Sequence, residues 1–284
     1  MSRDAQTNQD QATYWNEQGG ARWVALERDL DAQLEPYGSA VASILGLASG
    51  DRVLDVGCGA GATSLMLAMR VRPGQVLGVD ISAPLLERAR QRAEGIENLR
   101  FEDADAQTFT FAAGSHDVVF SRFGVMFFAD PLAAFRNLHG ALRSGGKVGF
   151  VCWRPMSENP SFALPLQAAL PFLPEAPAPP EPGAPGPFAF ADDARIREIL
   201  DGAGFRDIAI TPNDMEMVIG GRSDLESAVE LVVQIGPLGR ALSTLPEATR
   251  TRAREAVREA FSAHHTPNGV RLPSATWIVT ARKE

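Results

Sequence analysis

The sequence predicts an α/β fold: a doubly wound, mostly parallel sheet of seven strands, with helical insertions that form a lid. Three observations support this prediction. From residue 52 onward, apolar runs of strand length alternate with segments of helical periodicity, the pattern of βαβ units. A glycine-rich turn follows the first run. The chain has 284 residues, 45% of them apolar and 22% charged, which suits one elaborated globular domain.

The first three strands and two helices come from the strongest part of this alternation. Strand segments are rich in β-branched and apolar residues, and the helical segments repeat apolar residues every three or four positions. The expected strands cover 52–56, 75–80 and 98–105, and the expected helices cover 63–71 and 83–95.

The remaining core elements follow with clearer boundary signals. Asp130 and Pro131 are typical of a helix start, and Gly202 and Gly204 are typical of a helix end. The expected strands cover 116–122, 147–153, 206–210 and 274–283, and the expected helices cover 131–142 and 192–205.

Other segments interrupt or flank this core. Eleven prolines between Pro155 and Pro187 predict an extended, semi-rigid excursion, because proline is excluded from helix interiors and sheet centres. Two further helical stretches are expected over 223–235 and 246–265. The predicted organisation is an N-terminal helical lid (1–48), a cofactor-binding core (49–153), a proline-rich excursion (154–190), the remainder of the core (191–212 and 271–284) and a helical substrate cap (213–270).

Composition excludes several classes of function. With 27 basic and 35 acidic residues, the net charge is −8, and no basic stripe indicates a nucleic-acid partner. No run reaches the ~20 apolar residues of a membrane span. The polar first thirty residues lack a signal-peptide core, so we expect a cytoplasmic location. Cys58 and Cys152 are expected to be buried thiols, with no disulfide or metal site.

Taken alone, the glycine turn does not identify the cofactor. Its spacing, G-x-G-x-x-A from Gly57, also fits a dinucleotide-binding turn. Asp80 does not discriminate, because an acid at that position suits the ribose of any adenosine ligand. Asp55 does discriminate between cofactors, because its carboxylate would be repelled by a pyrophosphate. A cofactor with adenosine at one end and positive charge at the other fits better.

Four stretches together carry a family resemblance: VLDVGCGAGATS (53–64), GVDIS (78–82), DADAQTF (103–109) and the run from HDVVFSRFGVMFF to VGFVCW (116–153). In order and spacing they resemble the motifs of class I S-adenosylmethionine-dependent methyltransferases, especially those acting on quinones and natural products. The resemblance implies a Rossmann-like methyltransferase fold. It also implies S-adenosylmethionine as cofactor, S-adenosylhomocysteine as product, and methyl transfer to an oxygen, nitrogen or carbon nucleophile of a small molecule.

The resemblance also assigns cofactor contacts. Glycines and an acid would surround the methionine part, and a second acid would bind the ribose. Two residues after the third strand would bind adenine, with Asp103 replacing Asp105 if that strand ends two residues early. The predicted cofactor-binding residues are Asp55, Gly57, Gly59, Gly61, Asp80, Ile81, Asp105, Ala106 and Ser121.

Catalytic residues are less well indicated. Methyl transfer from a sulfonium depends mainly on positioning, so no general base is obligatory. The weak candidates are His264, His265 and Arg122, and an ordinary ion pair is an equal interpretation of Arg122. His116 and His139 are expected to be structural.

The acceptor site is expected to be apolar. Tyr14 and Trp15 would close over it or pack in the core, and Phe123 and Met126 would line it. After the fourth strand the chain has Ser-Arg-Phe-Gly where the nucleic-acid and protein-amide branch of the family has an acid or Asn followed by two prolines. This departure favours a small-molecule acceptor. The alternatives are a regulatory module that binds S-adenosylmethionine without turnover, and a nicotinamide-dependent dehydrogenase.

Overall fold

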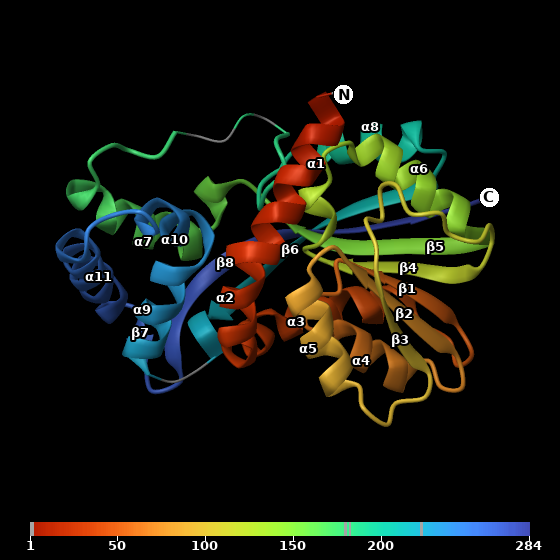
Figure 1. Cartoon of the computed structure of the whole chain (residues 1–284), viewed down its shortest axis with the longest axis horizontal. Helices are drawn as coiled ribbons and strands as arrows, with labels where there is room; N and C mark the ends of the chain where they lie inside the picture. Colours follow the sequence, from red (N-terminus) through yellow and green to blue (C-terminus); the bar gives the residue numbers. More distant parts are fainter. Residues whose placement is uncertain (1–2, 179–180, 182, 222–223) are drawn as a thin grey trace.

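A computed structural model describes residues 3–178, 181, 183–221 and 224–284, and it contains the predicted sheet (Figure 1). Seven strands lie in the order β3-β2-β1-β4-β5-β8-β6, and an eighth, β7, pairs only with β8. Neighbours from β3 to β5 are parallel, whereas β8 runs antiparallel between β5 and β6. The strands are β1 (Arg52–Val56), β2 (Gln75–Asp80), β3 (Leu99–Asp103), β4 (His116–Arg122), β5 (Leu142–Trp153), β6 (Arg206–Val218), β7 (His265–Thr266) and β8 (Gly269–Arg282).

Helices cover both faces of the sheet, which explains why the middle of each central strand is rich in buried apolar residues. On one face lie α3 (Glu27–Leu45), α4 (Ala62–Arg70) and α5 (Ala83–Arg92), and on the other α6 (Pro131–Ala141) and α8 (Asp193–Gly202) (Figure 1). The predicted start of α6 is confirmed, because the Asp130 side chain accepts a hydrogen bond from the Ala133 amide.

The strand order reverses between β1 and β4, which are direct neighbours. At such a switch point, the loops that leave the two strands diverge to opposite faces and open a crevice at their carboxyl ends. The glycine turn leaves β1 at this crevice. The fold therefore brings the turn and the ends of β2 and β4 to one edge of the sheet.

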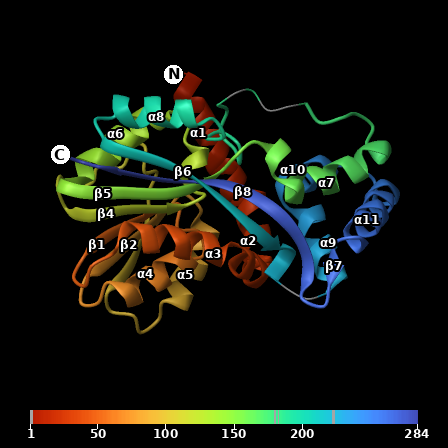
Figure 2. The ribbon, with the colours of Figure 1, turned by 180° about the vertical axis from the view of Figure 1, so that it is seen from behind.

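A helical cap extends from the same side of the molecule (Figure 2). The strands expected over 206–210 and 274–283 are longer than predicted, because β6 and β8 stay paired from Arg206–Arg282 to Val218–Arg271 and continue beyond the core. This long ribbon carries α7 (Pro160–Ala169), α9 (Leu225–Gln234), α10 (Gly236–Leu242) and α11 (Glu247–Ser262). The sequence predicted α9 and α11 but not α7 or α10.

The expectation that the proline-rich excursion is extended throughout was wrong for its first part. Residues 160–169 form α7 with Pro165 inside the helix. Pro160 occupies the first turn, where the missing N–H costs nothing. Pro165 is buried, so apolar packing offsets the lost hydrogen bond.

The N-terminal segment has two parts. Leu30, Leu34 and Val41 of α3 are at most 5% exposed and belong to the core. Before α3, the helix α1 (Arg3–Tyr14), the π-helix η1 (Trp15–Gly19) and α2 (Gly20–Ala25) cross between the core and the cap (Figure 1). Only this earlier part is placed to act as a lid.

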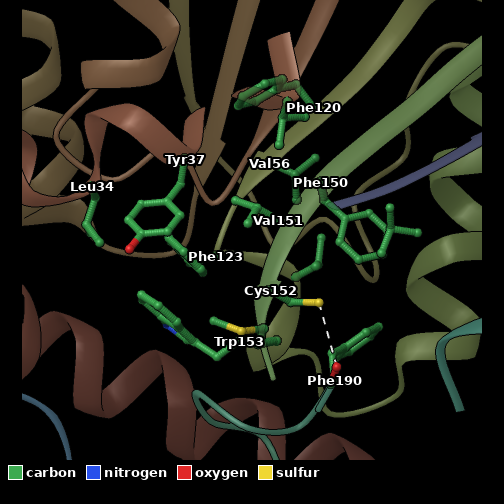
Figure 3. Close-up of a cluster of buried hydrophobic side chains, with 14 of the residues drawn as sticks. Leu34, Tyr37, Val56, Phe120, Phe123, Phe150, Val151, Cys152, Trp153 and Phe190 are labelled. Carbon is green, nitrogen blue, oxygen red and sulfur yellow. Dashed lines mark hydrogen bonds between the residues drawn. The ribbon is translucent and has the colours of Figure 1, made fainter. Parts of the chain in front are cut away.

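An aromatic cluster joins the core to the cap (Figure 3). Phe123 stacks on Trp153 with ring centroids 4.3 Å apart, and Tyr37 packs edge-on against both rings. Trp153 in turn contacts Phe162 of α7. Both cysteines are buried as expected, and the Cys152 thiol lies 3.6 Å from the Phe190 carbonyl. No helix in the described part of the chain is long and apolar enough to cross a bilayer.

Candidate cofactor and active site

The glycine turn after β1 has the backbone shape that glycine permits. Gly57 and Gly59 have φ values of +67° and +55°. A Cβ on Gly57 would lie 2.7 Å from the Gly124 Cα, so the turn packs tightly on the loop after β4. A Cβ on Gly59 would have no atom within 4 Å. The turn is therefore held rigidly from behind and open above Gly59, the arrangement that lets a ligand approach the backbone closely.

Asp55, in β1, is fully buried beside this turn. Its Oδ2 accepts hydrogen bonds from the Thr63 hydroxyl at 2.7 Å and the Ser64 hydroxyl at 2.6 Å, whereas Oδ1 has no hydrogen-bond partner. Burial raises the pKa of Asp55 to about 6, against the lowering effects of these hydroxyls and of Arg122. An unpaired buried carboxylate oxygen is costly unless a donor or cation meets it, so this atom fits the ammonium group of a methionine moiety.

Asp80, the last residue of β2, holds two loops together. Its Oδ2 accepts from the Gly59 amide at 2.8 Å, and its Oδ1 accepts from the Ser82 amide at 2.9 Å. Burial raises the pKa of this carboxyl group and the two amides oppose the shift. Each carboxylate oxygen can accept more than one hydrogen bond, so Asp80 retains capacity for ribose hydroxyls.

The third strand ends at Asp103, two residues before the end expected from the sequence. Asp103 is exposed, and Asp105 lies in the following turn. There the Asp105 carboxylate accepts from the Gln107 amide at 3.0 Å and the Thr108 hydroxyl at 3.2 Å. Asn137 of α6 donates to the Ala106 and Phe109 carbonyls and fixes this turn. Asp105 and Ala106 are thus held by a packed turn beside the end of β2.

Ser121 and Arg122 end β4 and have different surroundings. The Ser121 hydroxyl donates to the Val56 carbonyl at 2.7 Å and accepts from the Gly124 amide, so it ties β1 to the loop after β4. Arg122 lies 3.7 Å from Asp31 of α3, which confirms the ion-pair interpretation. Burial lowers the pKa of Arg122, and the nearby carboxylates of Asp31 and Asp55 oppose this.

A pocket of about 300 Å³ borders Arg122 between α3 and α4. Thr63, which donates to Asp55, is also in its wall. A larger depression of about 570 Å³ lies on the outer side of α8 and β6 and includes none of the residues around the glycine turn. The chemistry of the site therefore belongs to the smaller, charged pocket and the turn beside it.

The predicted acceptor residues lie in different environments. Phe123 is 8% exposed, with a φ of +62°, and is held by the aromatic cluster. Met126 is only 1% exposed and belongs to the hydrophobic core. Trp15 packs edge-on against Phe127 at 5.4 Å, and Tyr14 lies 5.5 Å from the Arg240 guanidinium of the cap.

The role of general base stays a prediction for the two candidate histidines. His264 and His265 are both exposed. They lie where α11 ends and β7 begins, on the outer end of the cap (Figure 2). His116 and His139 are structural, as expected: His116 is buried, and His139 packs against Phe205.

Sequence reasoning missed Asn16 and Asn137. Each uses a side-chain amide to hold a loop that follows β2 or β3. Asn137 lies within a helical pattern that gave no sign of this contact. Asn16 precedes a Gly-Gly pair in an otherwise helical segment, and that pair was the one available indication of a close backbone approach.

Comparison with known proteins agrees with this geometry. Residues 53–146 match a family model described as a methyltransferase domain. The uncharacterized protein Rv1403c of Mycobacterium tuberculosis is 36% identical over 165 residues, which cover 57% of this chain and 56% of that protein. The aklanonic acid methyltransferase DauC of a Streptomyces species is 34% identical over 144 residues, covering 50% of this chain and 64% of DauC. The chain thus matches just over half the length of these relatives.

A solved structure shares the fold. The chain is similar to Haemonchus contortus phosphoethanolamine N-methyltransferase 2, solved with phosphomonomethylethanolamine and S-adenosylhomocysteine, with a TM-score of 0.52 and 20% identity over 87% of this chain and 52% of that one. The order of the strands in the sheet and the glycine turn after β1 are both consistent with the matched family. Residues 53–146 are therefore similar to a methyltransferase domain.

Proposed function

We propose that the protein transfers the methyl group of S-adenosylmethionine to an oxygen, nitrogen or carbon nucleophile of a small molecule. The observation that carries this proposal is the arrangement around Gly59. The space above its Cα is open, its amide is held by Asp80, and the buried Asp55 alongside has an unpaired oxygen. One carboxylate suits a ribose and the other suits a cationic amino-acid end, which matches a cofactor that has both.

The cofactor would supply a methyl group already activated by a sulfonium. Asp55 and the turn from Gly57 to Gly61 would hold its methionine end, and Asp80 would accept hydrogen bonds from its ribose hydroxyls. Ile81 would pack on the adenine, and Asp105 and the Ala106 backbone would bind the ring edge. Ser121 would act indirectly, by fixing the loop after β4 against the glycine turn.

The residues around the strand ends would contribute orientation and exclusion of water. Bringing a nucleophile and a methyl group together in a dry pocket supplies a large part of the barrier reduction for such a displacement. The segment before α3, the loop with Phe123, and the cap surround this edge of the sheet (Figure 1). We therefore propose that the acceptor binds at this edge of the sheet, with Trp15, Tyr14 and Phe123 as the nearest aromatic residues.

A small-molecule acceptor is favoured over a macromolecular one. The chain carries a net charge of −8, unfavourable for nucleic acid. The name of DauC describes a methyltransferase for aklanonic acid, a small molecule. The partly buried Trp15 and Phe127, which pack edge-on against each other, would supply apolar surface for an acceptor of this kind.

The test is a turnover assay with methyl-labelled S-adenosylmethionine and a panel of phenols, amines and acidic carbon compounds. We expect labelled product from at least one class, together with release of S-adenosylhomocysteine. Binding of the cofactor with no turnover across the panel would favour a regulatory module. Stabilisation by NADH and not by S-adenosylhomocysteine in a thermal shift experiment would instead favour a dehydrogenase and contradict the proposal.

A further inference from the structure

The π-helix η1 places one side-chain amide against the loop that follows β2. Asn16 Nδ2 donates to the Ile81 carbonyl at 2.8 Å, and also to the Ala12 carbonyl one turn earlier. Its Oδ1 accepts from the Ala83 amide at 2.9 Å. A single side chain from the N-terminal segment thus pairs with backbone groups on both sides of Ser82.

A second contact sets how closely the N-terminal segment approaches the loop after β2. The Ser82 hydroxyl donates to the Trp15 carbonyl at 2.8 Å, and that carbonyl also accepts from the Gly20 amide, five residues on. A Cβ on Gly20 would lie 2.6 Å from the Ser82 Oγ and 2.9 Å from Pro84. The wide π turn and the glycine therefore let the helix backbone rest on the loop, and π turns of this kind often occur at functional sites.

The same loop holds the predicted adenosine contacts. The Ser82 amide donates to Asp80 Oδ1, and Ile81 lies between these two residues. Any shift of the loop changes the position of the Asp80 carboxylate and the Ile81 side chain. Asn16 is connected to both through a few backbone atoms.

The other contacts of this segment lead to the loop after β4 and to the cap. Trp15 packs on Phe127, and Tyr14 lies over the guanidinium of Arg240 in α10. The segment from Tyr14 to Gly20, which we call the latch, therefore contacts the loop after β2, the loop after β4 and the cap. These three parts surround the edge of the sheet where the acceptor is proposed to bind.

We infer that Asn16 is a positioning residue that couples the latch to the adenosine half of the cofactor site. The inference rests on the proposed function. A cofactor bound to the Ile81–Ala83 loop would stabilise the loop position in which Asn16 and Ser82 hold the latch. Because binding free energies are reciprocal, the factor by which the latch strengthens cofactor binding equals the factor by which the cofactor stabilises the latch in this position.

Three variants of the full chain test this inference. Asn16→Ala removes both contacts to the loop, and Asn16→Asp keeps an acceptor for the Ala83 amide but loses the donor to Ile81. Asn16 is exposed, so neither variant buries an unpaired group and both should melt as the wild type does. Asn213→Ala is the matched control, since Asn213 donates to the Thr276 hydroxyl between β6 and β8, outside the latch and the loop.

Two measurements are made on each variant: the Kd for S-adenosylhomocysteine by calorimetry, and the rate at which a protease cuts within residues 9–25 with and without saturating S-adenosylhomocysteine. Two hydrogen bonds at an exposed site predict a Kd raised roughly three- to tenfold by Asn16→Ala. Asn16→Asp should raise the Kd at least as much, because a carboxylate oxygen would then face the Ile81 and Ala12 carbonyl oxygens. The protection given by S-adenosylhomocysteine should fall by the same factor. Asn213→Ala should change neither quantity.

The outcomes separate this inference from the function on which it rests. If the wild type does not bind S-adenosylhomocysteine, the proposed function fails and the inference fails with it. If the wild type binds and Asn16→Ala retains both the affinity and the protection, the inference alone is overturned. A raised Kd with undiminished protection also overturns it, because the loop and the latch would then be uncoupled.

Discussion

The two oxygens of Asp55 have different surroundings, and this difference gives the site its chemical character. One oxygen accepts from two hydroxyls, and the other is buried without a partner. In a low-dielectric site, such an atom stabilises a bound cation strongly and destabilises the ionised carboxylate when no cation is present. The residue therefore links proton uptake, stability and cofactor binding.

Asp55 should make the stability of the unliganded protein depend on pH. Its pKa of about 6 in the folded state lies above the ~3.9 of an unfolded chain, so the folded state binds more protons between these values. The contribution of Asp55 to the free energy of unfolding therefore increases as the pH falls from about 6 towards 4. We expect the difference in Tm between Asp55→Asn and wild type to be largest, in favour of Asn, near pH 7.

The same substitution should affect binding in the opposite direction. The ammonium group of S-adenosylhomocysteine needs the ionised carboxylate as its partner, so the wild-type affinity for this ligand should fall as the pH drops below about 6. In Asp55→Asn the affinity should be lower at pH 7 and nearly independent of pH across this range. Calorimetry at pH 5, 6 and 7 measures both trends, and parallel pH profiles for the two proteins would contradict this role for Asp55.

At the scale of elements, two glycines of the β1–α4 turn are expected to have different roles, one in folding and the other in ligand binding. Gly57 packs on Gly124, whereas Gly59 faces open space, although both have positive φ. An alanine at either position adds roughly 1–2 kcal/mol of backbone strain. At Gly57 it adds a collision with the backbone as well, so the two substitutions should have different consequences.

Gly59→Ala should weaken S-adenosylhomocysteine binding at least tenfold. It should lower the stability of the fold only by the backbone strain of an alanine at positive φ. Gly95→Ala is the matched control, because Gly95 also has a positive φ of +82° with no neighbour near its Cβ, but lies after α5 away from the turn. Gly57→Ala should unfold at a clearly lower denaturant concentration than Gly59→Ala or Gly95→Ala. Equal affinities for Gly59→Ala and Gly95→Ala would show that nothing binds above Gly59.

Much of the core and cofactor site could be predicted from the sequence because the signals are local. A buried strand followed by a glycine turn and a helix is visible in one short window, and the acids in β1, at the end of β2 and after β3 occupy fixed positions in such windows. The contacts of Asn16 could not be predicted in this way, because 65 residues separate it from Ile81. Likewise, the exposed position of His264 depends on how the long β6–β8 ribbon directs the cap.

At the scale of the whole molecule, the segment before α3 connects core and cap and should be needed for transfer. Deletion of residues 1–25 removes α1, η1 and α2 but leaves the buried residues of α3. We expect the truncated protein to keep a cooperative thermal transition and to lose methyl transfer. Loss of the transition itself would mean that the segment completes the core.

Metal removal should leave activity unchanged. The described residues contain no group of three or more His, Cys, Asp or Glu side chains that could hold a metal ion, and the proposed transfer depends on positioning alone. Turnover with the acceptor identified in the panel should therefore survive EDTA. Loss of turnover that Mg²⁺ restores would require a metal in the reaction.

The central claim is that the acids and glycines at the strand ends form an S-adenosylmethionine site, and one titration tests it most directly. S-adenosylhomocysteine is titrated by calorimetry into the wild type and into Asp80→Ala, with the melting temperature of each protein as the control for folding. The account predicts one site per chain in the wild type and at least tenfold weaker binding in the variant, about 1.4 kcal/mol. Equal affinity in two folded proteins would contradict it.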